Sequence, residues 1–157
     1  MLLLLLEPPS LPSASQKVEK LTFQYTASDA SLAVLRLIAG LENLPANWDG
    51  EGAEVIQPSV VGGALSFVSS AYISQQMISE AEEFLPSVNP IPNNGIDILW
   101  EKPSGHLLVT IRQKPNENEP FALYHGQKNS EYQPSEIKGL EPLSKIHVKL
   151  IDFLIHL

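Results

Sequence analysis

Apolar residues recur at helical spacing in three segments of the chain, and each segment begins at a residue that favours helix starts. Ser28 is a favourable N-cap for a helix that runs to about residue 43 and carries a broad apolar surface. Pro58, a common residue at the first helical position, begins a second helix that runs to about Phe84. Pro142 begins a terminal helix over residues 142–156, which has one apolar stripe. The pattern therefore predicts three helices.

Between the second and the terminal helix, the spacing of apolar residues changes to one that strands favour. Turn sequences rich in glycine, proline and asparagine separate three predicted strands: residues 96–100, 106–112 and 121–125. A weaker strand candidate lies within 126–140, and residues 21–25 alternate as a short edge strand would. The order of elements predicts a single α+β domain, with an antiparallel β-meander of about three to five strands packed against about three helices.

Proline and glycine mark the interruptions in these patterns. The prolines within residues 86–92 end the helical pattern, and residues 93–95, Asn-Asn-Gly, are a strong turn sequence. Gly62 and Gly63 lie inside the second helix, where a glycine costs about 1 kcal/mol relative to alanine. We expect these two glycines to form a close-packing notch against another element.

An apolar arm begins the chain. The run from Met1 to Leu6 spans only about 9 Å as a helix and is followed by a proline-rich stretch. It is too short to cross a membrane and lacks the features of a secretory signal, so we expect an arm over residues 1–16, a domain over 17–157, and no membrane partner. Burying a leucine contributes about 1.5–3 kcal/mol, which favours self-association or partner binding through five consecutive residues: Leu2, Leu3, Leu4, Leu5 and Leu6. Docking beside the edge of the meander and disorder are the alternatives.

Composition and charge narrow the classes of function. Hydrophobic residues make up 43% of the chain and charged residues 18%, as in globular proteins. The absence of cysteine excludes disulfides and cysteine nucleophiles and is typical of a cytoplasmic protein. The net charge is −8, and residues 37–101 contain no Lys or Arg. Because phosphate neutralisation supplies most nucleic-acid affinity, we expect no nucleic-acid partner. The acidic segment would attract a cationic partner, and the alternative is a solvated acidic face that aids solubility.

A loop of unusual composition joins the first two predicted helices, with the sequence Leu44-Pro45-Ala46-Asn47-Trp48-Asp49-Gly50-Glu51-Gly52-Ala53. Further along lie Pro58 with Ala64-Leu65-Ser66-Phe67, a proline-rich turn, and Gly95-Ile96-Asp97-Ile98-Leu99-Trp100. This series resembles a family of small uncharacterised bacterial proteins that have a Trp-Asp-Gly-x-Gly-Ala loop, a proline-started helix and a Gly-Ile-x-Ile/Leu-x-Trp strand. The resemblance covers roughly residues 28–125 and, by pattern, the terminal helix. It implies no particular activity, but such proteins are similar to small operon-encoded partners, some of them toxin–antitoxin-like.

The loop has a structural and a functional interpretation. The Asp-Gly and Glu-Gly pairs at 49–52 favour turns with positive φ, and Trp48 would anchor the loop to the core. We expect Trp48 and Trp100 to be buried core residues. Alternatively, the carboxylates of Asp49, Glu51 and Glu54 form a divalent-cation cluster, although only the first part of an EF-hand pattern is present.

No residues have the spacing of a known catalytic or metal site. The four histidines lie outside the H-x-x-x-H and H-E-x-x-H patterns, and His106 and His125, although close enough on neighbouring strands to meet, are expected to be ordinary surface residues. We therefore expect no catalytic residue, cofactor or metal. The predicted function is a non-catalytic protein-binding protein, antitoxin-like or adaptor-like, acting through the apolar arm and/or an acidic surface at Asp49, Glu51 and Glu54. Its partner is another protein or a second copy. A small carboxylate-dependent enzyme with a site near residues 49–54, and a structural subunit of a larger assembly, are the alternatives.

Overall fold

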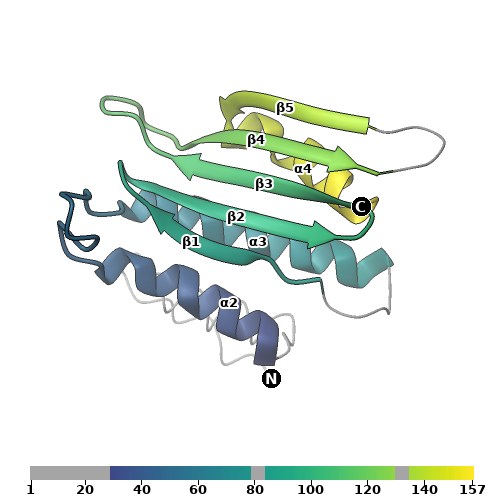
Figure 1. The fold of residues 1–157 in the computed structure, drawn as a ribbon, viewed down its shortest axis with the longest axis horizontal. Coiled ribbons are helices and arrows are strands. Elements are labelled where there is room, and N and C mark those ends of the chain that lie inside the picture. Colours follow the sequence, from purple (N-terminus) through teal and green to yellow (C-terminus); the bar gives the residue numbers. More distant parts are fainter. Residues whose placement is uncertain (1–28, 79–83, 130–134) are drawn as a thin grey trace, which may run out of the picture.

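Three helices lie against a five-stranded antiparallel sheet in the computed structural model, which describes residues 29–78, 84–129 and 135–157 (Figure 1). The elements follow in this order along the chain: α2 (Asp29–Gly40), the short 3-10 helix η1 (Leu41–Asn43), α3 (Pro58–Ile78), β1 (Ser87–Ile91), β2 (Gly95–Lys102), β3 (Gly105–Arg112), β4 (Phe121–Lys128), β5 (Ser135–Pro142) and α4 (Leu143–Ile155). The predicted α+β fold, with one meander packed on helices, is confirmed.

The sheet is a meander in which each strand pairs with the next one along the chain, in the order β1-β2-β3-β4-β5. Asn93 and Asn94 make the turn between β1 and β2 with φ angles of 64° and 56°, a region that asparagine tolerates. Gly105 begins β3 with φ of 150°, and a Cβ there would collide with the carbonyl oxygen of Gln127. These tight turns keep the long strands in direct register with their neighbours.

The helices cover one face of the sheet. α3 and α4 pack against that face, and α2 lies beside α3 next to β1 (Figure 1). Alternate strand residues point toward the helices and are buried: Ile96, Ile98, Trp100, Leu107, Val109, Ile111, Ala122 and Tyr124. Trp100 meets Phe67 of α3 edge to face, with ring centroids 5.6 Å apart and ring planes at 87°. The hydrophobic core therefore lies between the sheet and the helix layer.

Two glycines allow the helices to approach closely. A Cβ at Gly63 of α3 would lie 3.1 Å from Leu143 Cδ2 and 3.1 Å from Pro120 Cγ, so the close packing expected at Gly62 and Gly63 is confirmed at Gly63 and stays a prediction at Gly62. A Cβ at Gly126 of β4 would lie 2.7 Å from Cε1 of Phe153 on α4. The missing side chains at these positions make room for α4.

The structure differs from the sequence-based expectations at a few elements. Residues 87–91 were expected only as an interruption, but they form β1. β1 lies at the edge of the sheet, where a proline such as Pro90 is tolerated although it has no backbone N–H to donate. The weak candidate within 126–140 is β5, and the second helix is described to Ile78 rather than to Phe84. The N-terminal arm and the predicted strand at 21–25 lie outside the described residues.

Candidate functional site

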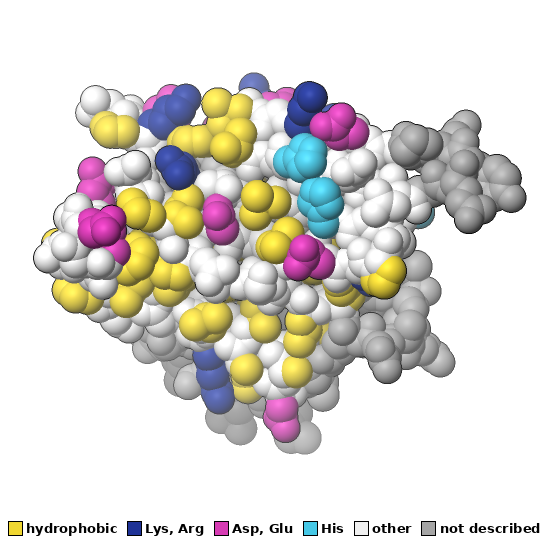
Figure 2. Space-filling model, viewed as in Figure 1, with side chains coloured by type: hydrophobic (Ala, Val, Ile, Leu, Met, Phe, Trp, Pro, Cys, Tyr) yellow, Lys and Arg dark blue, Asp and Glu magenta, His cyan; other side chains and the backbone are white. Residues whose placement is uncertain are grey.

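The face of the sheet that points away from the helices carries leucines that are open to solvent. Leu123 and Leu140 pair directly across β4 and β5 and are 50% and 52% exposed. Leu99 and Leu108 pair across β2 and β3 and are partly buried. Among the described residues, no helix or loop covers this face (Figure 1), and Figure 2 shows hydrophobic side chains spread across it. These four leucines are called the leucine patch below.

Polar groups lie among and beside the leucine patch. Asp97 projects from β2 on the same face, and its Oδ1 accepts a hydrogen bond of 2.5 Å from the hydroxyl of Thr110. Thr110 in turn pairs across the sheet with Leu123. Glu101, farther along β2, is exposed and lies directly opposite His106. The patch is therefore bordered on the β2 side by two carboxylates.

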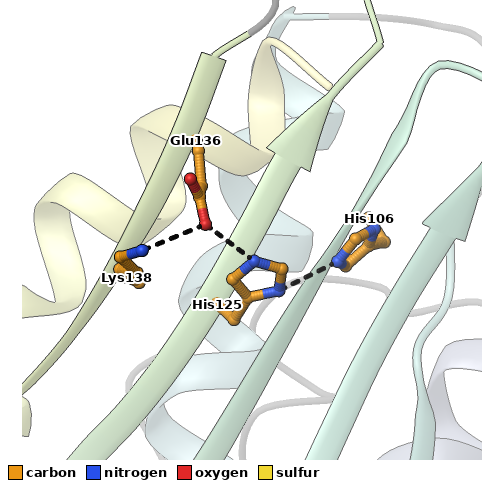
Figure 3. A network of polar contacts seen from close by, with 4 residues as sticks. All are labelled: His106, His125, Glu136 and Lys138. Carbon is orange, nitrogen blue, oxygen red and sulfur yellow. Dashed lines mark hydrogen bonds and ion pairs between the residues drawn. The ribbon is translucent and has the colours of Figure 1, made fainter.

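Two histidines and a glutamate form a chain of polar contacts at one end of this face (Figure 3). His106 Nε2 lies 3.2 Å from His125 Nδ1, and His125 Nε2 lies 3.2 Å from Glu136 Oε1. Lys138 Nζ approaches the same Glu136 oxygen at 3.6 Å. A hydrogen bond between two imidazole nitrogens needs one donor and one acceptor, so at least one of the two rings is neutral in this arrangement.

This histidine chain is a hydrogen-bonded network rather than a ligand set. Both ring nitrogens of His125 already face a partner, and its side chain is 44% exposed. Within the described residues, no group of three histidine or carboxylate side chains has a geometry that could hold a metal ion. The network is thus a polar border of the leucine patch, and the two histidines do lie together, as neighbouring strands allow.

The acidic loop is held together by its own hydrogen bonds. Asp49 Oδ1 accepts the backbone N–H groups of Ala53 and Glu51, both at 2.9 Å, and Asn47 Oδ1 accepts that of Gly52 at 2.6 Å. The bonds from Ala53 and Glu51 stabilise the ionised carboxylate and lower the pKa of Asp49 below its ordinary value of 3.8. The Asp49 carboxylate therefore acts as a structural acceptor within the loop.

Trp48 differs from its predicted role. Its indole Nε1 donates to the carbonyl oxygen of Glu54 at 3.3 Å, which supplies the acceptor that the ring needs. The side chain is only partly buried, and most neighbouring residues of the loop are exposed. The prediction that Trp48 is a buried core residue is wrong, whereas the prediction for Trp100, which is 1% exposed, is confirmed.

The residues predicted to contact a partner do not gather at one described site. Leu2 to Leu6 lie outside the described residues. Asp49, Glu51 and Glu54 lie in the loop before α3, away from the strands that carry the leucine patch, and their contact with a partner stays a prediction. The loop is tied to the sheet by Asn94 Oδ1, which accepts the backbone N–H of Gln57 at 2.7 Å.

The sequence analysis missed the leucine patch, although the sequence contains a signal for it. Ile98-Leu99-Trp100 and Leu107-Leu108-Val109 are consecutive apolar residues inside strands. Since neighbouring strand residues point to opposite faces, such runs place apolar side chains on both faces of the sheet.

No family model, curated protein or solved structure matches this chain. The resemblance to the Trp-Asp-Gly-x-Gly-Ala family therefore stays a prediction. None of the helices in the described part of the chain is long and apolar enough to cross a membrane.

Proposed function

We propose that this chain is a non-catalytic protein-binding protein whose leucine patch binds a basic segment of another protein that is apolar on one side. The observation that carries the proposal is the uncovered sheet face with Leu123 and Leu140 half exposed and in register. An antiparallel sheet with one face in water normally shows polar residues there. Exposed apolar side chains gathered on such a face, with polar side chains among and around them, are typical of an interaction surface.

Charge favours a basic partner over a second copy of the chain. The protein carries a net charge of −8, and β1 and most of β2 belong to the segment 37–101 that contains no Lys or Arg. Asp97 and Glu101 lie on the same face as the leucine patch. Complementary charge speeds association and like charge disfavours it, so the net charge of −8 favours a basic partner over a second copy, although Lys138 lies on the same face.

The exposed leucines supply a measurable part of the binding free energy. Fully burying a leucine contributes about 1.5–3 kcal/mol, and Leu123 and Leu140 still have half of their surface to bury. Each therefore contributes about 0.75–1.5 kcal/mol to a complex, which corresponds to roughly four- to twelvefold in affinity per leucine.

A purified system tests this proposal with a probe peptide of about twelve residues in which leucine and lysine alternate, so that an extended peptide is apolar on one side. We expect the peptide to bind the full chain and the double variant Leu123→Gln/Leu140→Gln to bind it about 100-fold more weakly. Val148→Gln is the matched control, because Val148 is 66% exposed on α4, outside the sheet. Titration calorimetry measures the affinities.

Two outcomes contradict the proposal. In the first, a peptide of alternating leucine and glutamate binds as tightly as the lysine peptide, which would remove the argument from charge. In the second, Val148→Gln weakens binding as much as the double variant, which would show that the leucine patch is not the binding surface.

A further inference from the structure

A hollow of about 270 Å³ lies between α3, α4 and the loop that joins β3 to β4. It belongs to the helix side of the molecule and is separate from the leucine patch. Gly63, Ser66 and Ser70 follow each other along α3 at spacings of three and four residues, so they share one face of that helix. The small side chains of Ser66 and Ser70 border the hollow, whereas Gly63 packs closely against Leu143 and Pro120 at its edge. This hollow is called the α3–α4 groove below.

The groove is lined by hydrogen-bonding groups that the described chain leaves unused. No hydrogen bond joins the hydroxyl of Ser66 or Ser70 to another residue in the described ranges. Glu119 Oε2 accepts a bond of 2.8 Å from the hydroxyl of Ser144, which leaves Glu119 Oε1 as a further acceptor. The N-terminus of α4 favours a negative group, and Glu119 occupies that place.

The tautomer of His147 follows from its contact. His147 Nδ1 lies 3.2 Å from the backbone carbonyl oxygen of Ser144, an atom that can only accept a hydrogen bond. Nδ1 therefore carries a hydrogen, and Nε2 can accept a hydrogen bond only in this Nδ1–H form of the ring. Glu119 Oε1 is thus an acceptor at the groove, His147 Nε2 is an acceptor in the Nδ1–H form, and the two serine hydroxyls can take either role.

We infer that the α3–α4 groove binds a small molecule that carries a primary ammonium group. An ammonium offers three donors and no acceptor, which suits a carboxylate oxygen, a ring nitrogen and two hydroxyls that can all accept a hydrogen bond. Glu119 supplies the formal negative charge of the lining, and because this residue is exposed, its pairing with an ammonium adds a modest, salt-dependent attraction. Phe67 and Leu143 add apolar surface for a short aliphatic body.

Other ligand classes fit this lining less well. An anion would meet the Glu119 carboxylate, and a purely apolar molecule would make no use of the polar groups in the lining. The volume lies just below the range of about 300–1,000 Å³ that holds drug-sized ligands, which favours a molecule of few heavy atoms.

The test is an NMR titration of the full chain with butylammonium chloride, with butanol and sodium butyrate as probes of equal chain length and with ionic strength held constant. We expect saturable shifts at the amides of Gly63, Ser66, Ser70 and His147 with butylammonium alone. Glu119→Gln is expected to weaken binding about three- to fivefold. The matched control is Glu117→Gln, which lies in the same loop but outside the groove lining. Glu117 is 3.9 Å from Lys114, and its replacement should change the affinity less than about twofold.

A second variant keeps the test decisive if Glu119→Gln disturbs the start of α4. Ser70→Leu fills the groove from α3 and leaves the contact between Glu119 and Ser144 in place. We expect it to abolish butylammonium binding while the melting temperature stays within a few degrees of that of the unmodified chain. Wild-type affinity in Ser70→Leu, or equal shifts with butanol or butyrate, would overturn the assignment. So would shifts that do not saturate below about 100 mM.

Discussion

Replacing each tryptophan by alanine compares a core position with a loop position in one chain. Trp100 is 1% exposed at the centre of the sheet and packs edge to face on Phe67 at 5.6 Å. Truncating such a residue to alanine costs about 3–5 kcal/mol, of which the aromatic pair supplies about 0.5–1.5 kcal/mol. Trp48 is only partly buried, and its one hydrogen bond, to Glu54, is worth about 0.5–1.5 kcal/mol. We therefore expect Trp48→Ala to cost about 1–2 kcal/mol in total.

Urea unfolding followed by far-ultraviolet circular dichroism measures both costs without relying on the tryptophan signal that the variants remove. Trp100→Phe is included because it keeps an aromatic ring and should cost about 1–2 kcal/mol, so a free energy can be measured even if Trp100→Ala is unfolded in water. Equal free energies of unfolding for Trp48→Ala and Trp100→Ala would refute the reasoning from burial, and a larger cost for Trp48→Ala would reverse it.

Three further changes test packing and electrostatics. Gly126→Ala should lower stability by about 1–3 kcal/mol, because its Cβ would lie 2.7 Å from Phe153 Cε1; an unchanged melting temperature would contradict this. Gly40→Ala should raise stability by about 0.4–1 kcal/mol, because Gly40 has φ of −67° and open space around it, and the same thermal melts check the sign. The folded-state pKa of Asp49 is lowered, so its carboxylate stabilises the fold above about pH 4 and loses this contribution as the pH falls through that pKa. Between about pH 5 and pH 2, the free energy of unfolding should therefore fall less for Asp49→Asn than for the unmodified chain. If acid unfolding gave the same pH dependence for both proteins, the role of the loop hydrogen bonds would be contradicted.

The elements that the sequence predicts well are those with one buried and one exposed side. The stripe of α4 and the alternation in β4 follow directly from such one-sided burial. β1 was harder to predict, because a proline such as Pro90 disfavours a strand anywhere but at the edge of a sheet. Which strand lies at the edge depends on how all five strands pair, and the local sequence does not contain this information.

The candidate site depends on strand register and helix packing, which join residues that are far apart in the sequence and cannot be read from a local pattern. Leu123 and Leu140 become neighbours only through the register of β4 and β5. Which face the helices cover depends on close approaches such as that of α4 to Gly126. The two-sided apolar runs in β2 and β3 indicate that both faces carry apolar residues, but they do not say which face stays uncovered.

The contacts that make the α3–α4 groove are equally remote in sequence. Ser70 and His147 line the same hollow from two different helices, and Glu119 reaches it from a loop between strands. Each of these residues is ordinary in its own segment. Only the packing of α3 against α4 brings their acceptors together.

Photo-crosslinking from the sheet face, in the cells that make the protein, tests the protein-binding proposal most directly. A photoreactive phenylalanine derivative replaces Leu123 in one variant and Val148 in another. Both positions are exposed and apolar, but Leu123 lies on the open sheet face and Val148 lies on α4. We predict that position 123 crosslinks to a basic segment of one other protein, that position 148 does not, and that adding Leu140→Gln abolishes the crosslink. A crosslink from position 123 to a second copy of this chain or to its own residues 1–28, equal crosslinking from both positions, or none from position 123 would contradict the proposal.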